Sequence, residues 1–294
     1  IPLLIFLKRN KIDYFVIHLI TSLPLILFNL FKFRTKLILR ISGYPKLNLV
    51  RKKLWSLSKN RVYKVTCPSK ELSESLKRKK IFFDNQIYLL PDAILSIKDF
   101  IFKKNDSKKS ENLETFDNFF LSIGRFTKQK NYFYLIEEFK KFCIIYPNEK
   151  LIIIGEGELK SSVQKKIIKE KLTKNIFIFG PTDNVYQYML KSKAFILPSL
   201  WEEVGFVIVE SALSNTLVIS SDCPNGPSEF LNYGNGGILF QNNKQNALLE
   251  KLKFFIENEN SFHNAKLSAK KNCKNYTLFN HYKNFENLLN ENKI

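Results

Sequence analysis

The sequence predicts an α/β protein whose second half is a doubly wound parallel sheet. Beyond residue 115, short apolar runs alternate with longer segments of helical periodicity. The apolar runs, such as LIII at 151–154, are continuously hydrophobic, which is typical of parallel strands covered by helices on both faces. The chain has 294 residues, 45% of them apolar, which suffices for one large or two ordinary domains with a core.

The expected elements of this second half follow from the pattern. Strands are predicted at 119–123, 151–154, 176–179 and 194–197, and helices at 131–146, 158–171, 185–191 and from about Gly205 onward. In the helix at 131–146, apolar residues such as Leu135, Phe139 and Phe142 recur every three or four positions, and charged residues take the other side. One face of this helix should therefore be buried.

The first half is predicted to hold further strands and helices. Strands are expected at 14–17, 36–41 and 61–65, a helix at 49–57 and an apolar run at 87–90. Residues 14–31 carry no formal charge, so a membrane span is one interpretation. Pro24 and several polar side chains interrupt the run, and a strand, a loop and a buried helix fit better. The polar stretch KKNDSKKSENLE at 103–114 has no hydrophobic period and is predicted to be a linker.

The chain is strongly basic, with 47 Lys and Arg against 27 Asp and Glu, a net charge of +20. Such a balance favours anionic partners, namely phosphates, nucleic acid or an acidic membrane face. Residues 1–110 hold 24 basic and 7 acidic residues, whereas residues 111–294 hold 23 and 20, which suggests two units with different partners. Because 40 of the 47 basic residues are lysine, a compositional bias that loads exposed faces with lysine is an open alternative.

Several classes of protein lose their main support. The four cysteines, Cys67, Cys143, Cys223 and Cys273, lie far apart with no CxxC pair. This spacing argues against a zinc cluster and against a small secreted domain stabilised by disulfide bonds. It favours a protein that resides in the reducing cytosol. The motifs GxxxxGK[ST], HExxH and Asp-x-Asp do not occur, so an ATPase, a zinc hydrolase and a metal-clamped transferase are disfavoured.

Candidate ligand-binding groups lie in the loops after the predicted strands, where doubly wound sheets bind their ligands. Arg125 and Lys130 share the first of these loops and could bind a diphosphate. The arginine would offer a forked set of hydrogen-bond donors and the lysine a point charge. The alternative is two solvated cations. The Gly155-x-Gly157 pair lacks the third glycine of the dinucleotide-binding fingerprint, so that interpretation is weak. The pair either lets the backbone approach a ligand closely or simply ends a strand.

Two carboxylates, Glu202 and Glu210, frame the helix expected to start at Gly205. A carboxylate can accept hydrogen bonds from two vicinal ribose hydroxyls, and a second one can hold the hydroxyls of a sugar. The alternative is that both acids only complement the helix dipole. His18 follows an apolar strand and either faces a cleft or serves as a structural histidine.

Taken in order, these loops resemble those of glycosyltransferase family 4. The resemblance rests on SIGRFTKQKN from Ser122, LIIIGEGELK from Leu151, IFIFGPTDNVYQYMLKSKAFILPS from Ile176, WEEVGFVIVESAL from Trp201 and SDCPNGPSEFL from Ser221. It implies the α/β GT-B fold, two facing Rossmann-like domains. The acceptor domain with its linker would span 1–112, the donor domain 113–275, and a helix at 276–294 would pack back toward the first domain. Because the glycine-rich acceptor loop of the family has no counterpart, the N-terminal domain is expected to be incomplete.

The resemblance also implies roles for individual residues. Glu210 would hold the nucleotide ribose and Glu202 the donor sugar, while Arg125 and Lys130 match the diphosphate-binding pair of the family. His18 is the nearest candidate for a histidine that touches the donor sugar. The other predicted contacts to the nucleotide sugar are Gly124, Gly155, Gly180, Pro181, Ser199, Val204, Gly205 and Phe206. Glu203 and Val204 stand where the family usually has a glycine and an aromatic residue, which could change the sugar preference.

The implied activity is the retaining transfer of a hexose or N-acetylhexosamine from a nucleotide-diphosphate sugar, UDP before other nucleotides, to a glycan or lipid-linked acceptor. No metal or other cofactor is expected, because cations would replace magnesium. The implied role is cell-surface polysaccharide synthesis in the cytoplasm, with contact to the anionic inner face of the membrane. Two alternatives stay open: a non-catalytic sugar-nucleotide-binding remnant, and a nucleic-acid-binding protein. The sequence lacks the basic motifs interspersed with aromatic residues that are typical of nucleic-acid-binding proteins, so we expect no nucleic acid as a partner.

Overall fold

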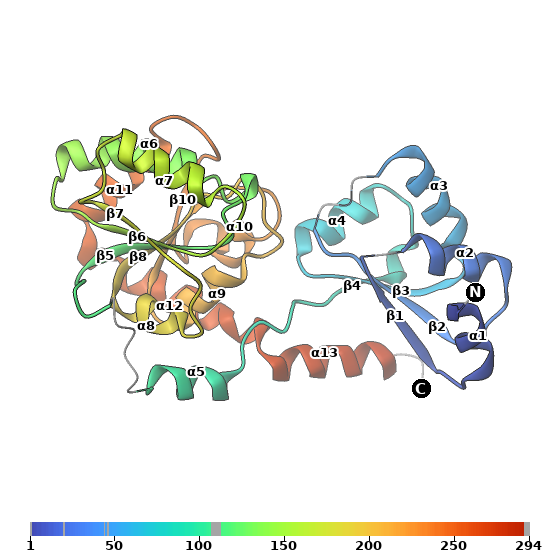
Figure 1. Cartoon of the computed structure of the whole chain (residues 1–294). Coiled ribbons are helices and arrows are strands. Elements are labelled where there is room, and N and C mark those ends of the chain that lie inside the picture. The colour runs from blue at the N-terminus through green and yellow to red at the C-terminus, as the bar shows by residue number, and fades with distance from the viewer. Residues whose placement is uncertain (1, 20, 44, 46, 107–112, 291–294) are drawn as a thin grey trace. The chain divides into compact units, whose positions relative to one another are not determined.

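The computed structural model describes residues 2–19, 21–43, 45, 47–106 and 113–290 (Figure 1). The chain divides into two compact units. The first consists of Ile1–Asp92 with His281–Ile294, and the second of Ala93–Asn280.

The first unit is built on a four-stranded parallel sheet with the strand order β1-β2-β3-β4. Its strands are β1 (Tyr14–His18), β2 (Lys36–Arg40), β3 (Val62–Cys67) and β4 (Ile87–Leu89), and its helices are α1 (Pro2–Arg9), α2 (Ser22–Leu30), α3 (Leu49–Ser58) and α4 (Lys70–Arg78). Parallel neighbours need crossover connections, which α2, α3 and α4 provide. Leu25 of α2 and Trp55 of α3 pack with Leu37, Leu39 and Val65 of the sheet into one core.

The second unit is a six-stranded parallel sheet with the order β10-β9-β8-β5-β6-β7. Its strands are β5 (Phe119–Ile123), β6 (Leu151–Ile154), β7 (Ile176–Phe179), β8 (Ser192–Leu197), β9 (Leu217–Ser221) and β10 (Ile238–Phe240). Its helices are α5 (Ile97–Lys104), α6 (Tyr132–Ile145), α7 (Lys160–Lys169), α8 (Val185–Lys191), α9 (Phe206–Leu213), α10 (Pro227–Phe230), α11 (Ala247–Glu257) and α12 (His263–Asn272). The prediction of a doubly wound parallel sheet is confirmed.

Helices cover both faces of this sheet (Figure 1). Helices α6, α7 and α11 pack on one face around Phe120, and α8, α9 and α12 pack on the other around Phe119 and Leu121. Successive residues of β5 thus enter opposite cores, which explains why every residue of this strand is buried.

The predicted elements agree closely with the observed ones in this unit. The strands at 119–123, 151–154 and 176–179 and the helix at 185–191 have the predicted bounds, and α6 is one residue shorter at each end than predicted. In the first unit, the predicted helix at 49–57 is α3, and the apolar run after Pro24 lies in α2. Across the described residues, no helix has the length and apolar character needed to span a membrane.

The division between the units lies earlier than the boundary expected at residue 112. The predicted linker at 103–114 begins inside helix α5, and its residues 107–112 lie outside the described part of the chain. Helix α5 belongs to the second unit because it packs on α8: the rings of Phe100 and Tyr186 meet edge to face at 4.9 Å, and Asn184 Nδ2 donates to Lys103 O at 2.8 Å. The helix expected at the C-terminus is α13 (Leu278–Asn290), whose residues from His281 onward group with the first unit.

Candidate functional site

The candidate site lies where the chain changes direction across the second sheet. Strands β5 and β8 are neighbours, but the chain continues from β5 toward β6 and from β8 toward β9. The loops that leave the carboxyl ends of these two strands therefore diverge, and this is the position at which doubly wound sheets bind ligands. They are residues 124–131 after β5 and residues 198–205 after β8, the two loops with the most predicted site residues.

The two loops meet through a buried ion pair. Lys130 Nζ lies 2.5 Å from Glu202 Oε1, and the two side chains are 13% and 8% exposed. Ser199 is fully buried, and its hydroxyl donates to the same carboxylate oxygen at 2.6 Å. Among the described residues, Oε2 of Glu202 has no hydrogen-bond donor. The carboxylate is thus fixed in position while one of its oxygens can still accept a hydrogen bond.

Hydrogen bonds to backbone oxygens hold the same loops together. Leu200 N donates to Gln129 O at 2.8 Å, and Gln129 Nε2 donates to Trp201 O at 2.8 Å. The loop after β9 packs closely on the residues around Glu203: a Cβ at Gly226 (φ +106°) would lie 2.3 Å from Glu203 O. These contacts fix the backbone on which Lys130 and Glu202 stand.

Glycines bring the loops after β5 and β6 together. A Cβ at Gly155 would lie 2.1 Å from Gly124 O, and one at Gly157 would lie 2.7 Å from both N and O of Phe126. A Cβ at Gly124 would lie 2.8 Å from Lys130 Cε. The Gly-x-Gly pair therefore lets one loop backbone approach another. Gly180 and Pro181 instead lie exposed after the edge strand β7, two strands away from β5.

Arg125 is an exposed cation of this site. It is exposed, next to buried Phe126, and it forms no ion pair with any residue that the structure describes. A guanidinium in this state can take an incoming anion without first giving up an internal partner.

Helix α9 directs its N-terminus toward the same loops. Gly205 precedes the helix with φ +82°, a conformation that L residues rarely adopt, so glycine is required here for its backbone. No side chain caps the helix, which leaves the first-turn N–H groups of Phe206 and Val207 available to an acceptor. Val204 is fully buried and anchors the turn, whereas the side chain of Phe206 is 50% exposed.

Glu210 lies in the second turn of α9 and is mostly buried. Burial raises the pKa of its carboxyl to about 7, although Lys103 partly counteracts this. None of the described residues donates a hydrogen bond or forms an ion pair with this carboxylate. Nearby Tyr186 has its pKa raised to about 12, first by its own burial and then by Glu210. A buried carboxylate without hydrogen-bond donors is costly, and hydroxyls of a ligand could supply those donors.

Three contributors were missed by the sequence analysis. Lys103 influences Glu210 from helix α5, in a stretch predicted to be a linker. Tyr132 donates to Gly124 O at 3.2 Å, and Ser221 Oγ donates to Ser199 O at 2.6 Å. Tyr132 looked like an ordinary residue on the buried face of its helix, so the sequence offered no signal for this role.

His18 lies at the carboxyl end of β1, exposed, in the first unit. The other predicted residues belong to the second unit. Across the described residues, no group of three His, Cys, Asp or Glu side chains is arranged to hold a metal ion.

Comparison with known proteins decides the family. The family model described as "Glycosyl transferases group 1" matches residues 103–272, more than half of the chain. The chain belongs to the group 1 glycosyltransferases.

Individual relatives agree with this assignment. An uncharacterized glycosyltransferase of Methanocaldococcus jannaschii is 42% identical over 112 residues, 38% of this chain and 28% of that protein. An N-acetylgalactosamine-N,N'-diacetylbacillosaminyl-diphospho-undecaprenol 4-alpha-N-acetylgalactosaminyltransferase of Campylobacter jejuni is 30% identical over 152 residues, 52% of this chain and 41% of that protein. The chain thus spans well under half of the length of either relative.

Solved structures share the fold. A glycosyltransferase from Rickettsia africae aligns with a TM-score of 0.81 at 18% identity, covering 99% of this chain and 79% of that one. Anabaena HepE in complex with UDP aligns with a TM-score of 0.81 at 15% identity, covering 99% and 81%. The GT-B fold expected from the sequence, with a Rossmann-like sheet in each unit, is confirmed.

Proposed function

We propose that this chain is a family 4 glycosyltransferase that binds a nucleotide-diphosphate sugar in its second unit and transfers a hexose or N-acetylhexosamine with retention of configuration. The observation that carries the proposal is the buried Lys130–Glu202–Ser199 cluster where the loops after β5 and β8 diverge. Exposed Arg125 and the uncapped start of α9 add two further groups that attract anions.

In this proposal each group has a distinct task. Arg125, Lys130 and the first-turn N–H groups of α9 stabilise the negative charge that develops on the departing diphosphate. Lys130 has three donor hydrogens, so it can keep Glu202 and still donate to a phosphate oxygen. Glu202 accepts a hydroxyl of the donor sugar through Oε2, and Glu210 accepts the ribose hydroxyls.

The reaction forms a bond between an acceptor hydroxyl oxygen and the anomeric carbon and breaks the bond from that carbon to the diphosphate. The hydroxyl proton leaves with the diphosphate, and retention requires attack from the face that the diphosphate leaves. No metal or other cofactor takes part in this proposal. His18 stays a candidate for contact with the donor sugar, in the first unit.

UDP is the nucleotide we propose, and a glycan or lipid-linked acceptor in cell-surface polysaccharide synthesis is the acceptor. Anabaena HepE was solved with UDP, and the Campylobacter jejuni relative is named as an N-acetylgalactosaminyltransferase acting on a diphospho-undecaprenol acceptor. A Staphylococcus aureus relative, 28% identical over 110 residues, is a poly(ribitol-phosphate) alpha-N-acetylglucosaminyltransferase.

Calorimetric titration of the full chain with UDP tests the site. Glu210→Ala and Arg125→Ala should each weaken binding about tenfold or more, because each removes a charge-assisted hydrogen bond. Lys128→Ala, which removes an exposed cation from the same loop, should not. Unchanged affinity in both site variants would overturn the assignment, and a thermal-shift screen of UDP-, GDP- and ADP-sugars would test the nucleotide.

The two alternatives predict different results in the same experiments. Binding of UDP-sugars without transfer to any glycan or lipid-linked acceptor would favour the non-catalytic sugar-nucleotide-binding protein. Retention of nucleic acid in a filter-binding assay, together with no binding of UDP, would favour the nucleic-acid-binding protein.

We also propose that the first unit contacts the inner face of the cytoplasmic membrane. This unit holds 21 Lys and Arg against 7 Asp and Glu. Helix α1 exposes Ile5 and Phe6 one turn before Lys8 and Arg9. Each lysine near anionic lipid contributes about 1 kcal/mol. Binding to anionic vesicles should weaken as salt is added, and equal binding to neutral vesicles would reject this location.

A further inference from the structure

The six-stranded sheet of the second unit ends in a strand whose outer side is open. In the strand order β10-β9-β8-β5-β6-β7, strand β7 is an edge strand, and within the described part of the chain it pairs only with β6. Charged residues, prolines and bulges are the usual means by which proteins protect a sheet edge from a further strand. The sequence of β7 is IFIF, and its pairing with β6 is continuous, so β7 uses none of these means.

The register shows which main-chain groups of β7 face the open edge. Gly155 N donates to Phe179 O at 3.1 Å, so the main-chain groups of Phe179 and of every second residue before it are directed toward β6. Those of Ile176 and Ile178 therefore face outward. Ile176 N already donates to Leu172 O at 2.9 Å. Among the described residues, no backbone hydrogen bond uses Ile176 O or either main-chain group of Ile178, so these groups are available to an added strand.

An apolar groove lies beside the same two isoleucines. It has a volume of about 470 Å³ and is formed by β7 and helix α7. Ile176 and Ile178 line it from the strand, and Ile167 and Ile168 line it from the helix. Ile168 is 64% exposed, although isoleucine is usually a buried residue. A strand added at the edge of β7 would place every second side chain on this face of the sheet, where apolar residues could fill the groove.

Positive charge surrounds the groove. Lys165 is exposed and lines it, and this lysine forms no ion pair with a described residue. Residues 160–175, which form α7 and the turn into β7, hold six lysines and one acidic residue. Lys160 and Lys166 have acidic partners elsewhere in the unit, and Glu170 is paired with Lys140, so a surplus of positive charge remains. This surplus would repel a second copy of the same edge and attract an acidic segment.

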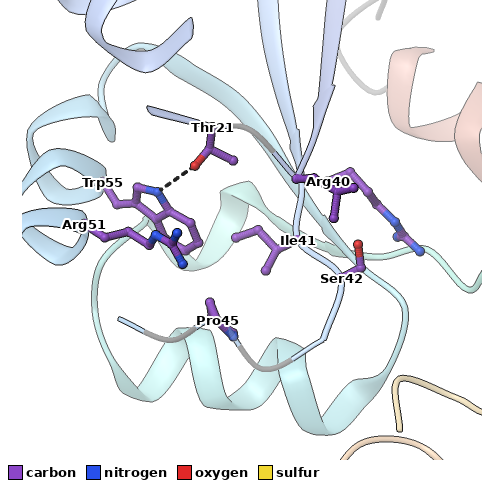
Figure 2. Close-up of a pocket in the computed structure, with 8 residues that line it drawn as sticks. Thr21, Arg40, Ile41, Ser42, Pro45, Arg51 and Trp55 are labelled. Atoms are coloured by element: carbon purple, nitrogen blue, oxygen red, sulfur yellow. Dashed lines mark hydrogen bonds between the residues drawn. The ribbon is translucent and has the colours of Figure 1, made fainter. Parts of the chain in front are cut away.

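A pocket in the first unit has a different character. It has a volume of about 290 Å³, and its lining includes Thr21, Arg40 and Trp55 (Figure 2). Polar groups of these residues are already bound within the chain, since Trp55 Nε1 donates to Thr21 Oγ1 at 3.3 Å and Arg40 Nη1 donates to Leu90 O at 2.7 Å. The groove beside β7 instead joins open main-chain groups to an apolar lining, which suits an extended polypeptide.

We propose that the edge of β7 and the groove beside α7 bind an extended acidic segment of a partner protein, which adds to the sheet as a further strand. Its main chain pairs with Ile176 O and with N and O of Ile178. Apolar side chains at alternate positions fill the groove, and acidic residues at its ends meet Lys165 and the lysines of the turn into β7. A hydrocarbon chain could fill the groove, but it has no donor or acceptor for the main chain of Ile178.

A synthetic peptide tests this surface. The probe is the capped peptide Glu-Glu-Ile-Thr-Val-Thr-Ile-Glu-Glu, and its charge-reversed control is Lys-Lys-Ile-Thr-Val-Thr-Ile-Lys-Lys. In calorimetric titrations of the full chain, the acidic peptide should bind at least about tenfold more tightly than the basic one. Hydrogen exchange followed by NMR should show that the acidic peptide slows exchange at Ile178 N–H, because this group then donates to the added strand.

Variants of the groove should weaken this binding. Ile168→Ser removes an exposed apolar side chain from the lining, and Lys165→Glu reverses a charge at its rim. Each should weaken binding of the acidic peptide about fivefold or more. Leu267→Ser and Lys271→Glu make the same changes at exposed positions on α12, which covers the opposite face of the sheet. These two controls should change the affinity by less than about twofold.

Several results would overturn the proposal. They are the absence of binding by the acidic peptide, unchanged hydrogen exchange at Ile178, and controls that weaken binding as much as the variants of the groove do. Sedimentation of the chain without peptide gives a further test. A dimer that Ile168→Ser dissociates would assign this edge to a second copy of the chain and not to an acidic partner.

Discussion

Glu210 should make the unliganded protein less stable as the pH rises, and Glu210→Gln should remove this effect. Burial raises the pKa of this carboxyl from the ordinary 4.5 to about 7, so between these values the folded protein holds a proton that the unfolded chain releases. The part of the stability that depends on Glu210 is therefore greatest below about pH 4.5 and falls until the pH passes about 7. At about 1.4 kcal/mol per pKa unit, the loss is about 3 kcal/mol.

The assay is urea unfolding of the unliganded wild type and variant at about pH 5 and about pH 8.5. Glutamine has no charge to desolvate, so Glu210→Gln should gain up to about 3 kcal/mol over wild type at the higher pH and much less at the lower one. The same variant should bind UDP more weakly, because an amide has one acceptor oxygen in place of two. Glu158→Gln, at an exposed position in the same unit, should show neither change. A gain in stability that is the same at both pH values, or a loss, would refute the reasoning.

Further substitutions test the packing of the site. Gly155→Ala should lower the free energy of unfolding in urea by about 2–4 kcal/mol, because the new Cβ would lie 2.1 Å from a backbone oxygen. Gly180→Ala is the control: a Cβ there would have no neighbour within 4 Å, so the free energy of unfolding should change by less than about 0.5 kcal/mol. Lys130→Met should cost about 3 kcal/mol by the same measurement, since Glu202 is left buried without its cation. Ser199→Ala should leave the fold intact, cost about 1 kcal/mol and weaken binding of UDP-sugars several-fold while affecting UDP itself less.

The second unit was the more predictable part of the fold. Its central strands are buried on both faces, so the run LIII at 151–154 is bounded by the first polar or glycine residue at each end. Helix α5 was missed because its polar end merges with the polar stretch at 103–114. What makes α5 part of this unit is its contact with Tyr186, about eighty residues later in the chain, which no local pattern reveals.

The candidate site was predictable as a set of loops and not as a set of contacts. The spacing of Lys130 and Glu202 placed each after a strand, but their pairing depends on β5 and β8 being neighbours, which is a property of strand order. The raised pKa of Glu210 likewise depends on burial by side chains from other helices. Sequence periodicity indicates which face of a helix is buried, and not how deeply a single carboxyl on its border is covered.

In the proposed donor site, the ion pair between Lys130 and Glu202 would divide recognition into two kinetic stages. Since these charges neutralise each other and are mostly buried, they exert little attraction on a molecule still diffusing in solution. In that proposal an approaching diphosphate would meet Arg125 on the surface first, so the charge of Arg125 should govern how fast encounters succeed and how strongly salt slows them. Lys130 would act only after arrival, by lengthening the residence time of a molecule already seated.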